Sequence, residues 1–365
     1  MASRICILSA VNIRHMSLIS LYTRILEDRG IPYDIVYMDK YCEEEQIGAA
    51  KKYVFVNKIN KRLPKFMRGM QYLKFVGYAK RVLEENQYDF IIVWNDVAIF
   101  LFGDYLAKRW RGKYCLNIRD YCHQGFRPIY NIFQRAIQGA AFTTLSSDGY
   151  KAFLPDEDYI FMHSLNEEVL ARCVPHVLNK DQKTPVKIGF IGNVRFFEVN
   201  KKLVDLFKGD KRFELHFYGT NSEVISRYAT EVGARNVVCG ASFPVSDTPD
   251  YISRIDIVNN LYGAGNPSVD YALSIKLYYS IYCHLPILTC PGTYMEQVTG
   301  ELGLGLSVGE LSERFPDAVY NWYTSLDEMS IARACEKRIG EIRAEQGAFF
   351  ATFDRVLASL PDEVR

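Results

Sequence analysis

The sequence lacks several patterns that identify common protein classes. No Cys-x-x-Cys pair and no His-Glu-x-x-His motif occurs, so its nine cysteines and six histidines give no sign of a zinc site. No apolar run reaches the roughly 18 residues that a membrane-spanning helix needs. The N-terminus shows no apolar segment of the signal-peptide kind. We therefore expect a cytoplasmic protein with reduced, mostly buried thiols and no metal.

An excess of charge of one sign is also missing. Lys and Arg number 44 against 43 Asp and Glu, so no overall field favours nucleic acid, and we expect none as a partner. The 365 residues, 48% of them hydrophobic, are enough for two domains with sizeable cores. Aromatic residues reach 14%, and tyrosine combines an apolar face with a polar tip that suits sugar and base recognition.

Short apolar runs alternate with helical patterns along both halves of the chain. In the first half they predict strands over 4–10, 33–39, 88–96, 113–121, 141–147 and 159–164. In the second half they predict strands over 185–194, 212–220, 236–243, 255–263, 286–290 and 302–308. This strand–helix–strand order is typical of parallel sheets, so we predict an α/β protein of two Rossmann-like domains.

The predicted elements suggest where the chain divides. We expect a first domain over 1–169, a polar linker over 170–184, a second domain over 185–326, and helices over 327–365 that cross back to the first domain. Ligands of such sheets bind beyond the carboxyl ends of the strands, so the two sheets would face one shared cleft.

A glycine turn follows the first strand of the second half, in GFIGNVRFFEVNKK (189–202). Gly192 would let the backbone approach a ligand closely, and Arg195, two residues after Asn193, could bind phosphate oxygens. An ordinary strand–helix turn with a solvated arginine explains the same residues, because one glycine and one arginine are a weak signal.

One lysine interrupts an otherwise apolar stretch, ALSIKLYYSIYCHLP (272–286). Ser274 can cap a helix, which places Lys276 in the first turn, where a cation is unfavourable by about 0.3–1 kcal/mol. A bound anion would reverse that sign, because helix N-termini attract anions. Tyr279 shares this face and could lie against a sugar or base. The alternative is that Lys276 extends to solvent and the tyrosines fill the core.

A polar turn also follows a strand of the first half, in NIRDYCHQGF (117–126). Arg119, Asp120 and His123 lie where a ligand-facing loop is expected, and they could orient sugar hydroxyls or transfer a proton. A structural Arg–Asp pair is the alternative.

The loop after the first strand, SAVNIRHMS (9–17), offers another polar set. Asn12, Arg14 and His15 precede a predicted helix at the same edge of the sheet. A helix cap with exposed side chains is the alternative.

Residues 51–83 contain ten Lys and Arg and no Asp or Glu. Apolar side chains at helical spacing alternate there with basic ones. The apolar set is Leu63, Phe66, Met67, Met70 and Leu73, and the basic set is Arg62, Lys65, Arg68 and Lys74. Such a helix could hold the protein on the anionic inner face of a membrane. A solvated basic face over a core stripe is the alternative.

Taken together, these segments resemble glycosyltransferases of the GT-B fold, in particular the retaining family 4 of the bacterial capsule and surface-polysaccharide type. SIKLYYSIYCHLPILT (274–289) is similar to the family's P-x-K-x-x-E-Y-x-A-x-G-x-P-V segment. IGFIGNVR, FELHFYGT and IDIVNNLYG match donor-domain segments in order. NIRDYC resembles the acceptor-domain segment in which other members carry His-Asp.

The resemblance implies a nucleotide-diphosphate sugar as co-substrate, which we expect to be a UDP-sugar, and no cofactor. It assigns to the donor site Gly192, Asn193, Arg195, Gly219, Ser274, Lys276 and Tyr279. It assigns to the acceptor site Asn12, Arg14, His15 and His123. The residues implied in catalysis are Asp120, Arg119, Lys276 and Arg195. No metal is implied, because a helix N-terminus and basic side chains neutralise the leaving diphosphate.

The function implied is transfer of a sugar, with retention, to a glycan or a polyprenyl-diphosphate-linked acceptor in capsular or surface polysaccharide synthesis. The chain departs from the family at two glutamates that stand eight residues apart in many members, because these positions fall on Tyr271 and Tyr279. A nucleotide-sugar epimerase and a sugar-binding module without catalysis are the alternatives, and the missing glutamates favour the second of these.

Overall fold

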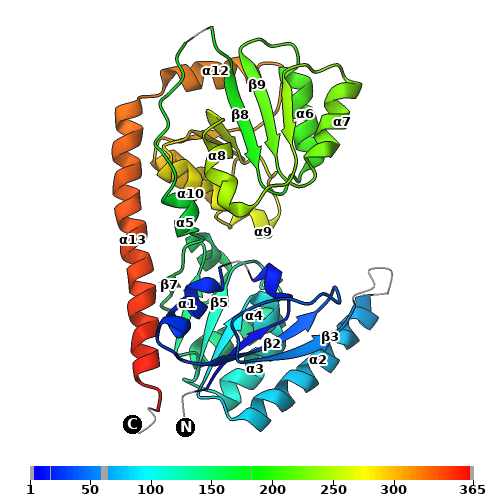
Figure 1. Cartoon of the computed structure of the whole chain (residues 1–365), viewed down its shortest axis with the longest axis vertical. Helices are drawn as coiled ribbons and strands as arrows, with labels where there is room; N and C mark the ends of the chain where they lie inside the picture. Colours follow the sequence, from blue (N-terminus) through cyan, green and yellow to red (C-terminus); the bar gives the residue numbers. More distant parts are fainter. Residues whose placement is uncertain (1–3, 17, 59–64, 182, 362–365) are drawn as a thin grey trace. The chain divides into compact units, whose positions relative to one another are not determined.

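The computed structural model describes residues 4–16, 18–58, 65–181 and 183–361, except for the side chains of residues 65–68. The chain forms two compact units, each a parallel sheet with helices packed against it (Figure 1). Unit 1 comprises Met1–His163 and Glu345–Arg365, and unit 2 comprises Ser164–Ala344. The domain boundaries inferred from the sequence remain a prediction.

Unit 1 contains a seven-stranded parallel sheet in the order β3-β2-β1-β4-β5-β6-β7. Its strands are β1 Ile5–Ser9, β2 Tyr33–Asp39, β3 Lys51–Val56, β4 Phe90–Trp94, β5 Tyr114–Ile118, β6 Phe142–Leu145 and β7 Ile160–Phe161. The central strands are buried along their whole length, which explains their continuous rather than alternating apolar runs.

The helices of unit 1 connect these strands. They are η1 Ile13–His15, α1 Ser20–Asp28, α2 Lys65–Asn86, α3 Asp96–Arg109, α4 Arg127–Gly139 and η2 Asp148–Phe153. Pro128 lies in the first turn of α4, where its missing N–H costs no hydrogen bond.

The longest helix, α13 Glu328–Ala358, begins in unit 2 and ends in unit 1. In unit 1 its Phe349 and Phe353 contact Tyr22 of α1 edge-on, with ring centroids 5.0 and 5.1 Å apart. These rings belong to the core cluster on one face of the sheet, together with Ile7 and Ile35. The end of the chain therefore completes the core that its beginning starts.

Unit 2 contains a six-stranded parallel sheet in the order β10-β9-β8-β11-β12-β13. Its strands are β8 Val186–Ile191, β9 Phe213–Tyr218, β10 Val237–Gly240, β11 Ile257–Asn259, β12 Ile287–Thr289 and β13 Gly305–Ser307. The other elements of unit 2 are α5 Glu167–Leu170, α6 Phe197–Phe207, α7 Ser222–Glu231, η3 Val245–Asp247, α8 Thr248–Ile252, α9 Pro267–Asp270, α10 Ile275–Tyr282, α11 Tyr294–Glu301 and α12 Phe315–Ser325.

Each strand predicted from the sequence has a counterpart in these two sheets, and the prediction of an α/β fold with two parallel sheets is confirmed. One strand was missed. The sequence pattern predicts a single amphipathic segment over 51–83, but this segment contains the strand β3 and most of α2. β3 lies at the edge of the sheet, where lysines are common because they discourage pairing with another chain. Leu63 and Arg62 lie outside the described residues.

Two expectations from composition can be compared with the structure. All nine cysteines are free thiols, but only Cys6, Cys115, Cys283 and Cys335 are buried, so the expectation of mostly buried thiols is wrong. Within the described residues, no helix is both long enough and apolar enough to cross a membrane.

Candidate functional site

The turns that follow β8 and β9 touch each other at the carboxyl edge of the unit 2 sheet. Gly192 and Gly219 have φ angles of 108° and 129°, which favour glycine. A Cβ on Gly219 would lie 2.0 Å from the carbonyl oxygen of Gly192. Asn221 Nδ2 also donates to Asn193 Oδ1 across the two turns, at 2.9 Å. The predicted donor-site residues Gly192, Asn193 and Gly219 are therefore neighbours.

Lys276 lies inside unit 2 rather than at its surface. Its side chain is 2% exposed, and Nζ donates to the carbonyl oxygen of Asn259 at 3.0 Å. The same nitrogen lies 3.0 Å from the ring centroid of Phe190 and 5.0 Å from that of Tyr262. The alternative in which Lys276 extends to solvent is wrong.

The surroundings of Lys276 disfavour its positive charge. Burial, followed by the charge of Arg195, lowers the pKa of the Lys276 ammonium well below its usual value. Among the described residues, Lys276 forms no ion pair with a carboxylate. The predicted cap is present, because Ser274 Oγ accepts from the N–H of Lys276 at 3.3 Å at the start of α10. The start of α10, the buried amine of Lys276 and the charge of Arg195 thus act on one another, and Lys276 is paired with no carboxylate in the described part of the chain.

Two buried asparagines connect Lys276 to the turn that carries Arg195. The backbone carbonyl oxygen of Asn259 accepts the hydrogen bond from Lys276 Nζ. The side-chain Nδ2 of Asn259 donates to Asn200 Oδ1 at 3.0 Å. Asn200 Nδ2 donates to the carbonyl oxygen of Arg195 at 2.7 Å and to that of Phe196 at 3.2 Å. Neither asparagine was identified from the sequence. The sequence does show Asn259 in an apolar strand, where a polar side chain needs a hydrogen-bond partner. That partner, Asn200, lies 59 residues away in the sequence and could not be identified from it.

An aromatic pair borders this cluster. Phe196, at φ 58°, stacks on Tyr262 with ring centroids 4.6 Å apart and an interplanar angle of 21°. The exposed Arg195 lies beside both rings, 5.4 and 6.0 Å from their centroids. Tyr279 lies elsewhere, because it is 6% exposed, packs in the core and bonds to Thr248. Burial raises the pKa of its phenol to about 12.

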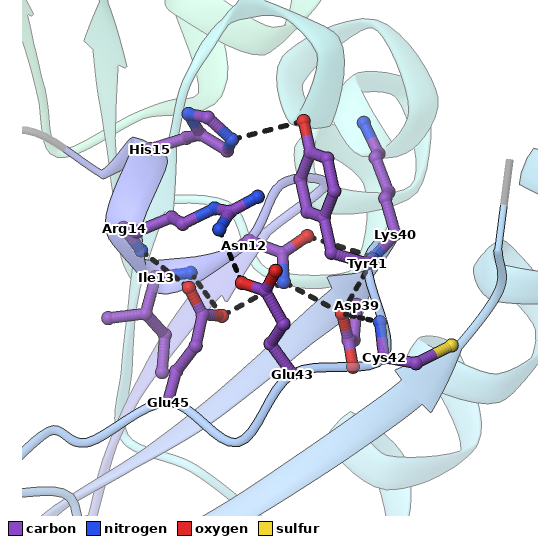
Figure 2. Close-up of polar contacts among 10 residues, drawn as sticks. All are labelled: Asn12, Ile13, Arg14, His15, Asp39, Lys40, Tyr41, Cys42, Glu43 and Glu45. Atoms are coloured by element: carbon purple, nitrogen blue, oxygen red, sulfur yellow. Dashed lines mark hydrogen bonds and ion pairs between the residues drawn. The ribbon is translucent and has the colours of Figure 1, made fainter. Parts of the chain in front are cut away.

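In unit 1, the loop after β1 is fastened by carboxylates (Figure 2). Asn12 is fully buried, and its Nδ2 donates to Asp39 Oδ1 at 2.8 Å and to Glu45 Oε2 at 3.0 Å. Glu45 also accepts from the backbone N–H groups of Ile13 and Arg14 at 2.9 and 2.8 Å. The amide of Asn12 thus holds the loop and does not point to solvent.

Figure 2 also shows the exposed side chains of Arg14 and His15, which contact residues of the segment after β2. The guanidinium of Arg14 lies 3.9 Å from the ring centroid of Tyr41 and pairs with Glu43. His15 Nε2 lies 3.2 Å from the hydroxyl of Tyr41. Arg14 and His15 are exposed, and their role in acceptor binding stays a prediction.

The turn after β5 carries the other predicted residues of unit 1. Asp120 is exposed, and its Oδ1 accepts from the N–H of Tyr121 at 2.7 Å. The guanidinium of Arg119 lies 5.5 Å from the ring centroid of Trp94. His123 is exposed at φ 59°, with its ring 5.9 Å from that of Tyr121. Since β1, β4 and β5 are parallel neighbours, this turn and the Asn12 loop lie along the same edge of the sheet.

No group of three or more His, Cys, Asp or Glu side chains in the described part of the chain is placed to hold a metal ion.

Comparisons with known proteins give structural matches only. No protein-family model matches the chain, and no curated protein matches it by sequence. Sucrose-phosphate synthase (tll1590) from Thermosynechococcus elongatus matches with a TM-score of 0.69 at 12% identity, over 98% of this chain and 100% of that one. Anabaena Alr3699/HepE in complex with UDP matches with a TM-score of 0.64 at 11% identity, over 96% and 100%.

A third match is WaaG, a glycosyltransferase involved in lipopolysaccharide biosynthesis, with a TM-score of 0.55 at 11% identity, over 92% of this chain and 93% of that one. At such identities the likeness concerns the fold. Two parallel sheets flanked by helices, matched over nearly the full length of these structures, show that the chain has the GT-B fold of two Rossmann-like domains.

Proposed function

We propose that the chain is a glycosyltransferase that takes a sugar from a nucleotide-diphosphate sugar, most simply a UDP-sugar, bound by unit 2. The observation that carries this proposal is Lys276, a buried amine at a helix N-terminus, close enough to Arg195 to be affected by its charge and paired with no carboxylate among the described residues. A diphosphate supplies the missing negative charge. The solved structures of Alr3699/HepE with UDP, and with UDP and glucose, support a nucleotide donor for this fold.

The reaction breaks the bond between the anomeric carbon of the sugar and a diphosphate oxygen. A new bond forms to an acceptor hydroxyl oxygen, and the hydroxyl proton is released. Arg195, Lys276 and the N–H groups at the start of α10 stabilise the charge that develops on the departing diphosphate. In this proposal Asp120 contacts the transferred sugar or the acceptor hydroxyl, with Arg119 beside it, and no metal takes part. Retention is the stereochemistry we propose.

The donor can be identified by thermal shift with UDP-, GDP- and dTDP-sugars. We expect the nucleotide diphosphates of one base to raise the melting temperature, and the matching monophosphate to raise it less, because it brings less charge to Lys276 and Arg195. If no nucleotide sugar and no free nucleoside diphosphate changes the melting temperature, the proposed function is wrong.

Arg195→Ala should weaken donor binding by about 10–100-fold, since a charge-assisted hydrogen bond contributes about 1.5–3 kcal/mol. Arg195 is exposed, so the melting temperature should change little. Lys201→Ala is the matched control, because Lys201 is a nearby cation of α6 that pairs with Glu198. Equal donor affinity in both variants, measured by calorimetry, would show that Arg195 does not bind the donor.

A sugar-binding module without catalysis is the second candidate. It is favoured by Tyr271 and by the core position of Tyr279, where the resemblance calls for two carboxylates. Donor binding without transfer to any acceptor would support it. An epimerase would instead convert the donor sugar when no acceptor is present.

For the acceptor we propose a glycan or a polyprenyl-diphosphate-linked sugar of a surface polysaccharide, met at the inner membrane face. Met70 and Leu73 of α2 are 54% and 67% exposed, and Lys74 beside them is exposed as well. Exposed apolar side chains among basic ones suit an anionic membrane surface.

The double variant Met70→Glu, Leu73→Glu should sediment less with anionic liposomes than the wild type, because it removes apolar contact and adds repulsion. Met329→Glu is the control, since Met329 of α13 is 70% exposed on another helix. Equal sedimentation of all three proteins would exclude α2 as the membrane contact.

A further inference from the structure

Asn200, near the start of α6, holds the backbone on both sides of a strained residue. That residue is Phe196, which precedes the helix in a left-handed conformation, with φ 58° and ψ 49°, that is unfavourable for a residue with a Cβ. Asn200 Nδ2 donates to the carbonyl oxygens of Arg195 and Phe196, at 2.7 and 3.2 Å. Its backbone N–H also donates to the carbonyl oxygen of Phe196, at 3.1 Å. Asn200 therefore holds the peptide groups before and after Phe196.

Asn200 is in turn held by Asn259, the last residue of β11. Both side chains are buried, and Asn259 Nδ2 donates to Asn200 Oδ1 at 3.0 Å. Asn259 Oδ1 accepts from the N–H of Leu261 at 3.0 Å, which fixes the orientation of its amide. The backbone carbonyl oxygen of Asn259 accepts from Lys276 Nζ. The end of β11 thus bonds to Lys276 directly and to the turn that carries Arg195 through Asn200.

The left-handed conformation of Phe196 places groups that the proposed donor site uses. The ring of Phe196 stacks on Tyr262, and the guanidinium of Arg195 lies beside both rings. Strained residues persist only where the surrounding structure holds them, and they are concentrated at ligand sites. The hydrogen bonds from Asn200 are the contacts that hold Phe196 in this conformation.

We propose that Asn200 and Asn259 are positioning residues that fix Arg195 and Lys276 relative to each other before the donor binds. This inference rests on the proposed function, in which both basic residues contact the diphosphate. A site that is arranged in advance loses less conformational freedom when its ligand binds, so more of the contact energy appears as affinity. Without the amide of Asn200 the turn can relax from its strained conformation, and Arg195 must then be ordered again each time a donor binds.

The first test is donor affinity, measured by calorimetry with the nucleoside diphosphate that the thermal-shift panel identifies. Asn200→Ala should weaken binding by about 10-fold, and by no more than Arg195→Ala does. Because Asn200 acts through Arg195, the double variant Asn200→Ala, Arg195→Ala should bind no more weakly than Arg195→Ala alone. Wild-type affinity in Asn200→Ala, or losses that simply add in the double variant, would overturn the inference.

Asn236→Ala is the matched control. Asn236 Nδ2 also donates to backbone carbonyl oxygens, those of Phe207 and Phe213 at 2.8 and 3.0 Å. Asn236 comes just before β10, so it lies at the opposite edge of the sheet from the end of β11. This variant should lower the melting temperature and leave donor affinity unchanged. If it weakens donor binding as much as Asn200→Ala does, general destabilisation explains both results and the positioning role is wrong.

Hydrogen exchange is the second test and needs no donor. The amides of residues 194–200 should exchange faster in Asn200→Ala than in the wild type, because the turn opens more often, and at the wild-type rate in Asn236→Ala. Unchanged exchange in Asn200→Ala would contradict the role of Asn200. If the wild type binds no nucleotide, the proposed function is wrong, and the exchange rates still decide whether Asn200 holds the turn.

Asn200→Ser replaces Asn200→Ala in both tests if the alanine variant does not fold. A serine hydroxyl can donate to the carbonyl oxygen four residues earlier, that of Phe196, but it does not also reach that of Arg195. The serine variant should therefore fold better, and it should still bind the donor more weakly than the wild type. Wild-type donor affinity in Asn200→Ser, together with wild-type exchange, would overturn the inference.

Discussion

Lys276→Met is expected to raise the melting temperature of the ligand-free protein while removing most of its donor affinity. Methionine keeps the apolar contacts with Phe190 and Tyr262 but needs no counter-charge. Removing a poorly compensated buried polar group should add about 1–3 kcal/mol to the free energy of unfolding. Donor binding should weaken by about 10–100-fold, since a charge-assisted contact to the diphosphate is lost. Differential scanning fluorimetry and calorimetry measure the two effects.

The stability difference between Lys276→Met and the wild type should depend on pH. The folded-state pKa of Lys276 is lowered, so its contribution to stability is present at high pH and is lost as pH falls through the folded-state pKa. The advantage of Lys276→Met should therefore grow as pH falls. Lys202→Met, an exposed lysine of α6, is the control and should change neither property. Wild-type donor affinity in Lys276→Met would contradict the anion site, and a lower melting temperature would contradict the cost of the buried charge.

Gly219→Ala should be the most destabilising single substitution in the site. The added methyl would meet the backbone carbonyl of Gly192 at 2.0 Å, and backbone cannot move aside as a side chain can. The positive φ adds strain for any residue with a Cβ. We expect a loss of roughly 3–5 kcal/mol in the free energy of unfolding, measured by urea titration, together with loss of donor binding as the turn at Gly192 shifts.

Gly209→Ala separates strain from steric overlap. Gly209 has a φ of 78°, but a Cβ there would have no neighbour within 4 Å, so only the strain of roughly 1–2 kcal/mol should remain. If both alanine variants lose the same free energy, the contact between the two turns does not determine the stability of the site.

The strands were predictable because buried parallel strands are continuous apolar runs, and Lys276 was recognisable because it is the one full charge in such a stretch. β3 was missed because KKYVFV begins with two lysines and merges into the longer basic segment. These signals are local, within a few residues of the chain.

The supporting residues of the site were not predictable in the same way. These residues act through hydrogen bonds to partners that lie 17 to 59 positions away in the sequence. They are Glu45, Asp96, Asn200 and Asn259. A lone Asn or Asp after a strand has many possible partners, and the sequence does not say which one it meets. Asn12 shows the converse, because a residue chosen as a ligand contact proved to be held by Asp39 and Glu45.

The path of α13 determines when unit 1 can finish folding during synthesis. Phe349, Phe353 and Leu357 complete its core, yet they are made after the whole of unit 2. The first 163 residues must leave the ribosome with the apolar surface around Tyr22 uncovered, and an isolated fragment of that length should be prone to aggregate. A stop codon ahead of Phe349 should therefore destabilise unit 1, which begins the chain, more than unit 2, because the missing residues belong to the core of unit 1.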